Sequence, residues 1–131
     1  MRKGFTLVEI MIVVAIIALL AAVAIPGLLR ARITANDAAA QANLKSLATA
    51  IEAYAAVNNG LYPDAEVNLT TATPPYMGRV YGGTSSGGYV YSAGTFAIGN
   101  YTMTATPAQC NSTGTKIYTI STGAVLVSTG C

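Results

Sequence analysis

The sequence predicts an α+β fold, in which one long N-terminal α-helix packs on an antiparallel β-sheet of three or four strands. Residues 5–25 form a nearly unbroken apolar run, and residues 41–55 carry apolar side chains at helical spacing. Residues 89–128 instead form β-rich runs separated by turn signals. The chain has 131 residues, so we expect one small domain with a thin core after the apolar run.

The apolar run from Phe5 to Ile25 has the length of a membrane-spanning helix. It reads FTLVEIMIVVAIIALLAAVAI. A helix of about 20 apolar residues matches the hydrocarbon core of a bilayer, which is roughly 30 Å thick. Glu9 is the one carboxylate in the run, and an ionisable residue inside a spanning helix indicates a function because it is costly to place there.

Pro26 comes directly after this run, inside a helix that we expect from about Thr6 to Val57. A proline within a helix removes one hydrogen bond and clashes with the preceding turn, so a kink or local unwinding is expected there. The alanine-rich segment 35–42 favours continuation of the helix. Beyond it, apolar side chains share one face: Leu44, Leu47, Ala48, Ile51, Tyr54 and Ala55.

The segment Asn58-Asn59-Gly60 is a stop signal for the helix, because asparagine and glycine adopt the left-handed conformation of a helix cap. Residues 61–88 follow, with three prolines and many glycines, and we expect them to connect the helix to the sheet. A loop of this length is usually functional or locally structured. Three tyrosines lie in it, for which anchoring to the head or to a neighbouring copy is one interpretation and ordinary ring packing the simpler one: Tyr62, Tyr76 and Tyr81.

The β-rich part of the chain is expected to form the sheet. Its predicted strands are Tyr89–Ser92, Phe96–Thr106, Lys116–Ser121 and Ala124–Ser128. Alternation within them indicates one covered face, and the helix is its expected cover.

Two cysteines are present, Cys110 and Cys131, and histidine is absent. In an exported head the two cysteines favour a disulfide that closes a loop of about 20 residues. Two free thiols in a cytosolic protein are the alternative.

The composition argues against an enzyme. Without histidine neither a Ser/His nor a Cys/His pair can form, and no glycine pattern between a strand and a helix provides a phosphate loop. We therefore predict no catalytic residue, no cofactor and no metal. Asp64 and Glu66 are too few for the six or more oxygens that calcium takes, so we interpret them as solvated surface acids. Only 9% of the residues are charged, with 7 basic and 5 acidic, so no specific nucleic-acid site is identifiable.

The segment Gly4-Phe5-Thr6-Leu7-Val8-Glu9, followed by an apolar run that ends in Ile25-Pro26, resembles the N-terminus of type IV pilins and pseudopilins. The resemblance covers roughly the first thirty residues. It implies that a prepilin peptidase and N-methyltransferase cuts between Gly4 and Phe5 and methylates the new amine. The implied parts are a leader (1–4), a transmembrane and filament-core helix (5–29) and a pilin head (30–131). The head would hold the amphipathic helix to about residue 58, a variable loop (59–88) and the sheet (89–131).

The resemblance also implies how copies assemble. The helix would hold a single-pass precursor in the lipid of the inner membrane, with the head exported, and would later pack in the core of a helical homo-oligomeric filament. Phe5, Thr6, Glu9 and Pro26 would be the assembly residues, with Glu9 paired to the Phe5 amine of a neighbouring copy. The simpler interpretation is that Glu9 snorkels into the headgroups and complements the helix dipole. Ala18 stands where the family often has a glycine.

The predicted function is that of a structural subunit, a major pilin of a type IV pilus that serves adhesion, motility or DNA uptake. Its partners would be further copies, the prepilin peptidase and an inner-membrane assembly platform. One alternative is a pseudopilin of a type II secretion system, since Gly60-Leu61-Tyr62-Pro63 resembles the start of the head in some of them. The other is a soluble secreted binding module, whose signal peptide would be cleaved at Ala22-Val23-Ala24.

Overall fold

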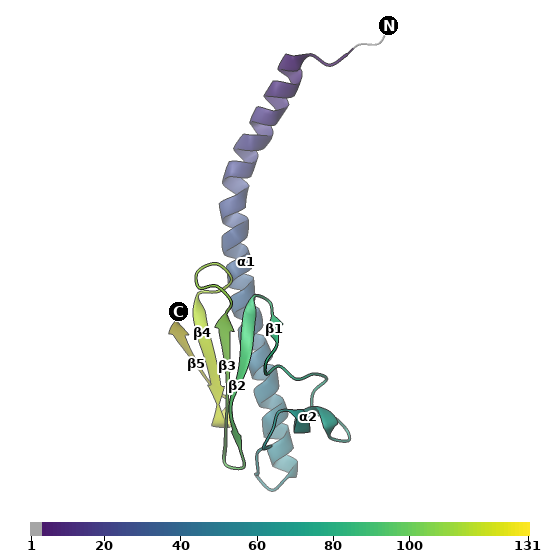
Figure 1. The fold of residues 1–131 in the computed structure, drawn as a ribbon, viewed down its shortest axis with the longest axis vertical. Helices are drawn as coiled ribbons and strands as arrows, with labels where there is room; N and C mark the ends of the chain where they lie inside the picture. The colour runs from purple at the N-terminus through teal and green to yellow at the C-terminus, as the bar shows by residue number, and fades with distance from the viewer. Residues whose placement is uncertain (1–3) are drawn as a thin grey trace. The chain divides into compact units, whose positions relative to one another are not determined.

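The computed structural model describes residues 4–131 and confirms the α+β fold (Figure 1). Residues 1–3 of the expected leader lie outside the described residues. The chain divides into two units, the second of which spans Ile33–Cys131 and is called the head below. The elements in chain order are α1 (Leu7–Val57), α2 (Val67–Thr71), β1 (Ser85–Ser86), β2 (Tyr89–Ala97), β3 (Asn100–Pro107), β4 (Lys116–Ser121), the 3-10 turn η1 (Thr122–Ala124) and β5 (Val125–Gly130).

The first part of α1, residues 7–29, is apolar on all sides except at Glu9. Its large apolar side chains are at least half exposed, from 51% for Ile10 to 79% for Val23, and Phe5 just before it is 85% exposed. By length and composition this helix can cross a membrane, with a mean hydropathy of 3.0 in its most apolar part. Contact between such an apolar surface and water is unfavourable, so we expect lipid or protein to cover it. The helix continues through Pro26, where we expected a kink or local unwinding. Leucine and alanine on both sides are good helix formers and support it there.

Within the head, α1 buries one face against the sheet. Its buried residues follow the predicted helical spacing: Ala40, Leu44, Leu47, Ala48, Ala50, Ile51 and Ala55. The helix ends where the stop signal lies. Asn59 has a φ of 57°, and the Gly60 N–H donates to the carbonyl oxygen of Ala55 at 2.8 Å, which is the bond expected of a Schellman cap.

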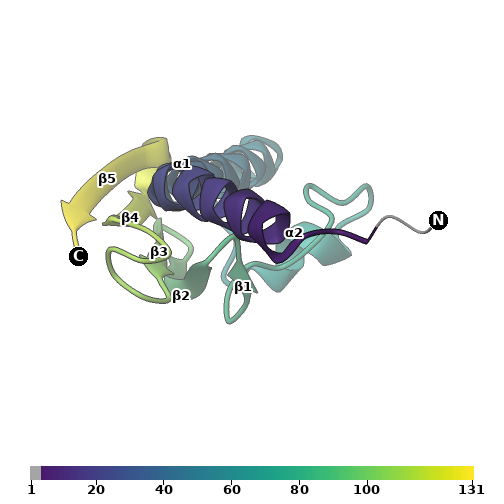
Figure 2. The ribbon, with the colours of Figure 1, turned by 90° about the horizontal axis from the view of Figure 1, so that it is seen from above.

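The sheet has five antiparallel strands in the order β1-β2-β3-β4-β5, one more than predicted. The strand labels can be followed in that order in Figure 2. The additional strand, β1, is two residues long and pairs Ser85 with Val90 and Ser86 with Tyr89. It lies in the segment that we expected to be a loop.

The break predicted between the strands Tyr89–Ser92 and Phe96–Thr106 is wrong. Ser92–Thr95 lies inside β2, which has a bulge between Ala93 and Phe96, and the chain reverses at residues 98–99 instead. A glycine in a strand often marks such a bulge. A Cβ added at Gly94 would lie 3.2 Å from the Thr102 carbonyl oxygen, so the absence of a side chain lets the two strands approach.

The core lies between α1 and one face of the sheet. The sheet contributes mainly tyrosines to it: Tyr89, Tyr91, Tyr101 and Tyr118, together with Met103, Ala105 and Ile120. The three tyrosines of the connection also pack within the molecule. Their ring centroids lie 5.2 Å (Tyr62 to Tyr101), 5.6 Å (Tyr76 to Tyr54) and 5.4 Å (Tyr81 to Tyr91) from their neighbours. This agrees with the simpler of the two interpretations, ordinary ring packing.

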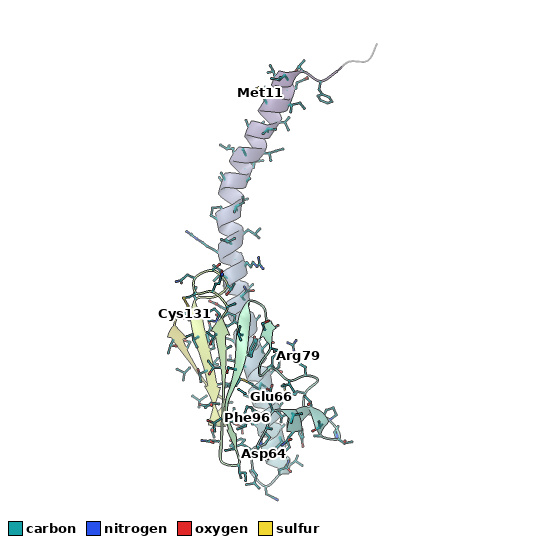
Figure 3. The ribbon with its side chains drawn as sticks, viewed as in Figure 1. Met11, Asp64, Glu66, Arg79, Phe96 and Cys131 are labelled. Carbon is teal, nitrogen blue, oxygen red and sulfur yellow. A yellow bond between two sulfur atoms is a disulfide. The ribbon has the colours of Figure 1, made fainter. Side chains whose placement is uncertain are left out.

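Glu66 is not the solvated surface acid that we predicted. It is 6% exposed, and its carboxylate accepts hydrogen bonds from the N–H groups of Tyr81 (2.5 Å) and Gly82 (2.8 Å). A buried carboxylate is tolerated because these backbone donors satisfy it. Glu66 thereby holds the far end of the connection against α2, and Figure 3 labels it beside that helix.

The disulfide between Cys110 and Cys131 is present, with Cα atoms 5.8 Å apart. The segment it closes is also bound to α1, because the Asn36 side chain donates to the Thr113 carbonyl oxygen at 2.9 Å. The alternative of two free thiols is therefore not observed.

Candidate assembly site

The start of α1 is closed by hydrogen bonds between Thr6 and Glu9. The Glu9 N–H donates to Thr6 Oγ1 at 3.3 Å. In return Glu9 Oε2 accepts from the Thr6 N–H at 2.8 Å and from the Thr6 hydroxyl at 2.7 Å. This reciprocal arrangement is a capping box, which satisfies N–H groups that have no partner within the helix. The positive end of the helix dipole also favours a carboxylate at this place.

The two oxygens of the Glu9 carboxylate have different surroundings. Oε2 is used by Thr6, whereas Oε1 has no hydrogen-bond partner among residues 4–131. The side chain is exposed. An ionised carboxylate accepts at both oxygens, and its bonds to cationic donors are the strong ones. Glu9 therefore closes its own helix with one oxygen, and its other oxygen is able to accept a further hydrogen bond.

An open apolar hollow of about 660 Å³ lies beside this cap, on one face of the helix. Its lining is almost entirely apolar: Phe5, Thr6, Leu7, Ile10, Met11, Val14, Ala15 and Ala18. Met11 is labelled on this first part of α1 in Figure 3. The small side chains of Ala15 and Ala18 lower the helix surface, which lets a second helix approach closely.

The predicted site residues do not all lie together. Phe5, Thr6 and Glu9 meet at the start of α1, and the bond between Gly4 and Phe5 lies in an exposed segment without secondary structure, where a protease can reach it. Pro26 is 17 residues beyond Glu9, or about 26 Å along an ideal helix. The structure thus places Pro26 apart from the cap.

Sequence reasoning missed the capping role of Thr6 and the position of Ala18. A Thr-x-x-Glu spacing directly before an apolar run is the sequence signature of a capping box, and Thr6-Leu7-Val8-Glu9 has it. The sequence marks Ala18 only as a departure from a family pattern, whereas in the structure it lines the apolar hollow.

The polar cluster around Asp37 in the head binds the disulfide-closed segment to α1. Asp37 accepts hydrogen bonds from the Tyr89 hydroxyl (2.6 Å), the Thr115 hydroxyl (2.7 Å) and the Thr115 N–H (3.1 Å). Desolvation raises the pKa of Asp37, but the hydrogen bonds from Thr115 and Tyr89 and the charge of Lys116 outweigh it, so the pKa is lowered. Glu52 has a similar role, because it accepts from the hydroxyls of Tyr62 and Tyr101.

These head carboxylates bind neighbouring groups of the same chain. In the part of the chain that the structure describes, no group of three or more His, Cys, Asp or Glu side chains is placed to hold a metal ion. The start of α1 differs, because Glu9 Oε1 has no hydrogen-bond partner among residues 4–131 and an open apolar hollow lies beside it.

The first 25 residues match the family model described as the prokaryotic N-terminal methylation motif. The type IV wide pilus major component PilA4 of Thermus thermophilus is 54% identical over 57 residues, which is 44% of this chain and 44% of that protein. The type IV major pilin protein PilA of Myxococcus xanthus is 48% identical over 53 residues, which is 40% of this chain and 24% of that protein.

A third relative comes from another system. The type II secretion system core protein G of Aeromonas hydrophila is 34% identical over 79 residues, which is 56% of this chain and 54% of that protein. The chain thus spans about half or less of the length of each of these relatives. The resemblance to type IV pilins and pseudopilins that the first residues indicate is confirmed.

Proposed function

We propose that this chain is a pilin, the structural subunit of a type IV pilus, and that it polymerises through the first part of α1 into an extracellular filament. The observation that carries the proposal is the carboxylate of Glu9, whose Oε2 has hydrogen-bond partners and whose Oε1 has none among residues 4–131, in a part of α1 that is otherwise apolar and exposed. The chain's similarity to PilA4 and PilA, which are described as a pilus major component and a major pilin, supports it.

The path to the filament begins at the exposed segment before α1. A prepilin peptidase and N-methyltransferase cuts between Gly4 and Phe5, which the match to the methylation motif supports. The apolar helix then remains attached to the head and holds the subunit in the inner membrane, because its length and hydropathy suit a bilayer. An inner-membrane assembly platform transfers the subunit from lipid to the filament.

Cleavage creates a donor that suits Glu9. The new amine at Phe5 is a cation, and a carboxylate excluded from water requires a charged or hydrogen-bonded partner. Glu9 Oε1 accepts from the amine of a neighbouring copy while Oε2 keeps the helix cap closed. Only one axial offset between copies brings the two groups together. The pair therefore sets the register, as a buried polar residue does in a coiled coil.

The proposal is tested with Glu9→Gln and Glu9→Ala in the native host. Both variants are expected to be cleaved after Gly4 and to enter the membrane, since the peptidase site and the apolar surface are unchanged. They are expected to form no filaments, because the charged pair is lost. Mass analysis of the N-terminus, membrane fractionation and electron microscopy of sheared filaments measure the three steps.

Lys45 is an exposed residue of α1 in the head, so Lys45→Gln serves as a control. This variant should assemble normally. Normal filaments from Glu9→Gln would contradict the role of the charged pair. A mature chain that begins after Ala24 would overturn the whole proposal, because the helix would then be a discarded signal peptide. Loss of adhesion, twitching motility or DNA uptake on deletion would assign the role of the filament.

A second candidate is a pseudopilin of a type II secretion system. The similarity to core protein G of Aeromonas hydrophila, 34% identical over 56% of this chain, is the observation that supports it. The two functions separate on deletion of the gene. Loss of secreted proteins without loss of surface filaments would favour the pseudopilin.

A further inference from the structure

A small pocket of about 250 Å³ lies in the head where α1 ends. Three parts of the chain line it: the last turn of α1 and its cap, the start of the connection, and the turn between β2 and β3. The lining residues are Tyr54, Asn58, Leu61, Tyr62, Asp64 and Ile98. Asp64 is labelled at this end of the head in Figure 3. The volume is below the roughly 300–1,000 Å³ of pockets for drug-sized ligands, so it suits a single ring.

The walls of this pocket are held in place by hydrogen bonds. The Tyr62 N–H donates to the Ile98 carbonyl oxygen at 3.1 Å, which joins the connection to the β2–β3 turn. The Asn58 side-chain amide donates to the Tyr54 carbonyl oxygen at 2.8 Å. A ligand therefore meets a preformed site and does not have to order a loop, which lowers the entropy cost of binding.

Two side-chain acceptors at the pocket, on Asn58 and Asp64, remain for a ligand, and the Tyr54 hydroxyl in the lining can accept as well as donate. The Asn58 amide uses its N–H₂ group, and its Oδ1 has no partner among residues 4–131. Asp64 accepts from the Asn68 side chain at Oδ1, whereas Oδ2 has no partner within the same described residues. No lysine or arginine lines the pocket. These acceptors suit a ligand with several hydroxyl donors.

The rest of the pocket is aromatic and aliphatic. The Tyr62 hydroxyl donates to Glu52 at 3.2 Å and its ring packs against Tyr101, and the Tyr62 ring also belongs to the lining of the pocket. Leu61 is 50% exposed and Ile98 is 62% exposed, and both belong to the lining. The face of an aromatic ring is electron-rich and attracts the weakly positive C–H groups of a sugar ring.

We propose that this pocket binds one pyranose ring of an uncharged glycan. The sugar hydroxyls donate to Asp64 and Asn58, and its C–H face lies against the tyrosine rings. An organic ammonium ion also suits a carboxylate beside aromatic rings. The glycan is favoured because Asp64 is exposed and already accepts a hydrogen bond from the Asn68 amide, and because the second acceptor, Asn58, is neutral.

A shallow site of this kind binds weakly as a single copy. Repetition along a filament raises the overall affinity about 10²–10⁴-fold when several sites engage one polysaccharide. The gain by repetition rests on the proposed function, whereas the pocket itself does not. A test on unassembled chain therefore separates the two.

The test is a titration of the ¹⁵N-labelled full chain in zwitterionic micelles with the methyl glycosides of glucose, galactose, mannose and N-acetylglucosamine. At least one is expected to shift the amide signals of Asn58, Leu61, Tyr62 and Ile98 saturably. Asp64→Ala is expected to weaken that binding at least about fivefold, as the loss of a hydrogen bond to a charged group predicts. Ile98→Ser, an exposed change in the lining, should weaken it as well.

Thr129→Ala on β5 is the matched control, because Thr129 is exposed and is not part of the lining. It should bind as the unchanged chain does. The proposal is overturned if none of the four sugars shifts these amides, or if Asp64→Ala and Ile98→Ser both leave the binding unchanged. Tetramethylammonium is titrated in parallel, and shifts from it without shifts from any sugar would assign the pocket to a cation instead.

Discussion

Thr6 explains how a carboxylate is accommodated at the start of a membrane-length helix. An isolated carboxylate in an apolar helix requires donors, and the N–H and hydroxyl of Thr6 supply two to Glu9 Oε2. The same bonds satisfy the first turn of the helix, whose N–H groups have no helical acceptor. Glu9 thus has a partner within its own chain, and the proposed pairing through Oε1 does not have to break that contact.

Thr6→Val should loosen the first turn of α1 without changing the apolar surface. Valine keeps the shape of threonine but lacks the oxygen that accepts from the Glu9 N–H. The loss of an N-cap side chain increases opening of the first turn about fivefold. Hydrogen exchange of the Leu7–Glu9 amides in micelles measures it, with Thr6→Ser as the control that keeps the oxygen. Equal exchange in the valine and serine variants would show that the cap is not held by Thr6.

The carboxylates of the head show which residue roles were open to sequence reasoning and which were not. The Thr6–Glu9 cap is local and has a recognisable spacing. The partners of Glu66 and Asp37 are 15 to 78 residues away along the chain. No periodicity links such positions, so a buried Glu66 looked the same in the sequence as a solvated one. Only the packing of the connection against the sheet brings its donors together.

At the scale of the elements, helix α1 was predictable and the strands less so. The helix was expected from about Thr6 to Val57 on its periodicity, and it is observed over Leu7–Val57. Its end follows from one local signal, the left-handed Asn59 before Gly60. The β2–β3 region contains Gly94 and Gly99, and either glycine can mark a turn. In the structure Phe96 pairs with Tyr101, which places the turn at Gly99. Strand pairing depends on the whole sheet and cannot be predicted from the local sequence.

The connection between α1 and the sheet depends on one side chain, Glu66. Glu66→Gln replaces one carboxylate oxygen with an N–H₂ group that cannot accept from a backbone N–H. The segment around Arg79, which is exposed, should therefore open more often. Loss of a hydrogen bond to a charged group predicts about a tenfold or greater increase in opening. The rate of tryptic cleavage after Arg79 in the native protein measures it.

Asp64→Asn is the control for this experiment, because Asp64 is exposed and does not bind the segment around Arg79. It should be cleaved at the original rate. A Glu66→Gln variant cleaved no faster than the unchanged chain would show that other contacts hold the connection.

At the scale of the whole molecule, tyrosines make the stability of the head sensitive to alkali. Burial raises the pKa of Tyr101 to about 12, and burial is also the main cause that raises the pKa of Tyr62, Tyr89, Tyr91 and Tyr118. Unfolded tyrosines ionise near pH 10. The unfolded state therefore releases protons at a lower pH than the folded state.

The free energy of unfolding should accordingly be maintained below about pH 10 and should fall as the pH rises from there through 12. Absorbance of ionised tyrosine at alkaline pH should rise together with the loss of near-ultraviolet circular dichroism. Ionisation of every tyrosine near pH 10 with the dichroism unchanged would contradict it. The lowered pKa of Asp37 has the opposite sign, so its contribution should be lost as the pH falls below about 4.

The glycan pocket and the apolar hollow show the limit of sequence reasoning for the whole chain. The hollow lies within one helix, so its residues could be found from their spacing once the helix was predicted. The pocket combines Tyr54, Asp64 and Ile98 from three separate elements. Nothing in their sequence positions brings them together, since the sequence predicts the end of the first long strand several residues before Ile98.

The disulfide makes residues 110–131 a closed covalent ring that contains β4, η1 and β5. A single break of the backbone anywhere between Cys110 and Cys131 therefore leaves both new ends attached to the same molecule. Asp37 and Asn36 also bind the ring to α1, so the two strands keep their place beside it. In the proposed filament, a subunit would therefore keep all of its mass after one broken peptide bond in this part of the head.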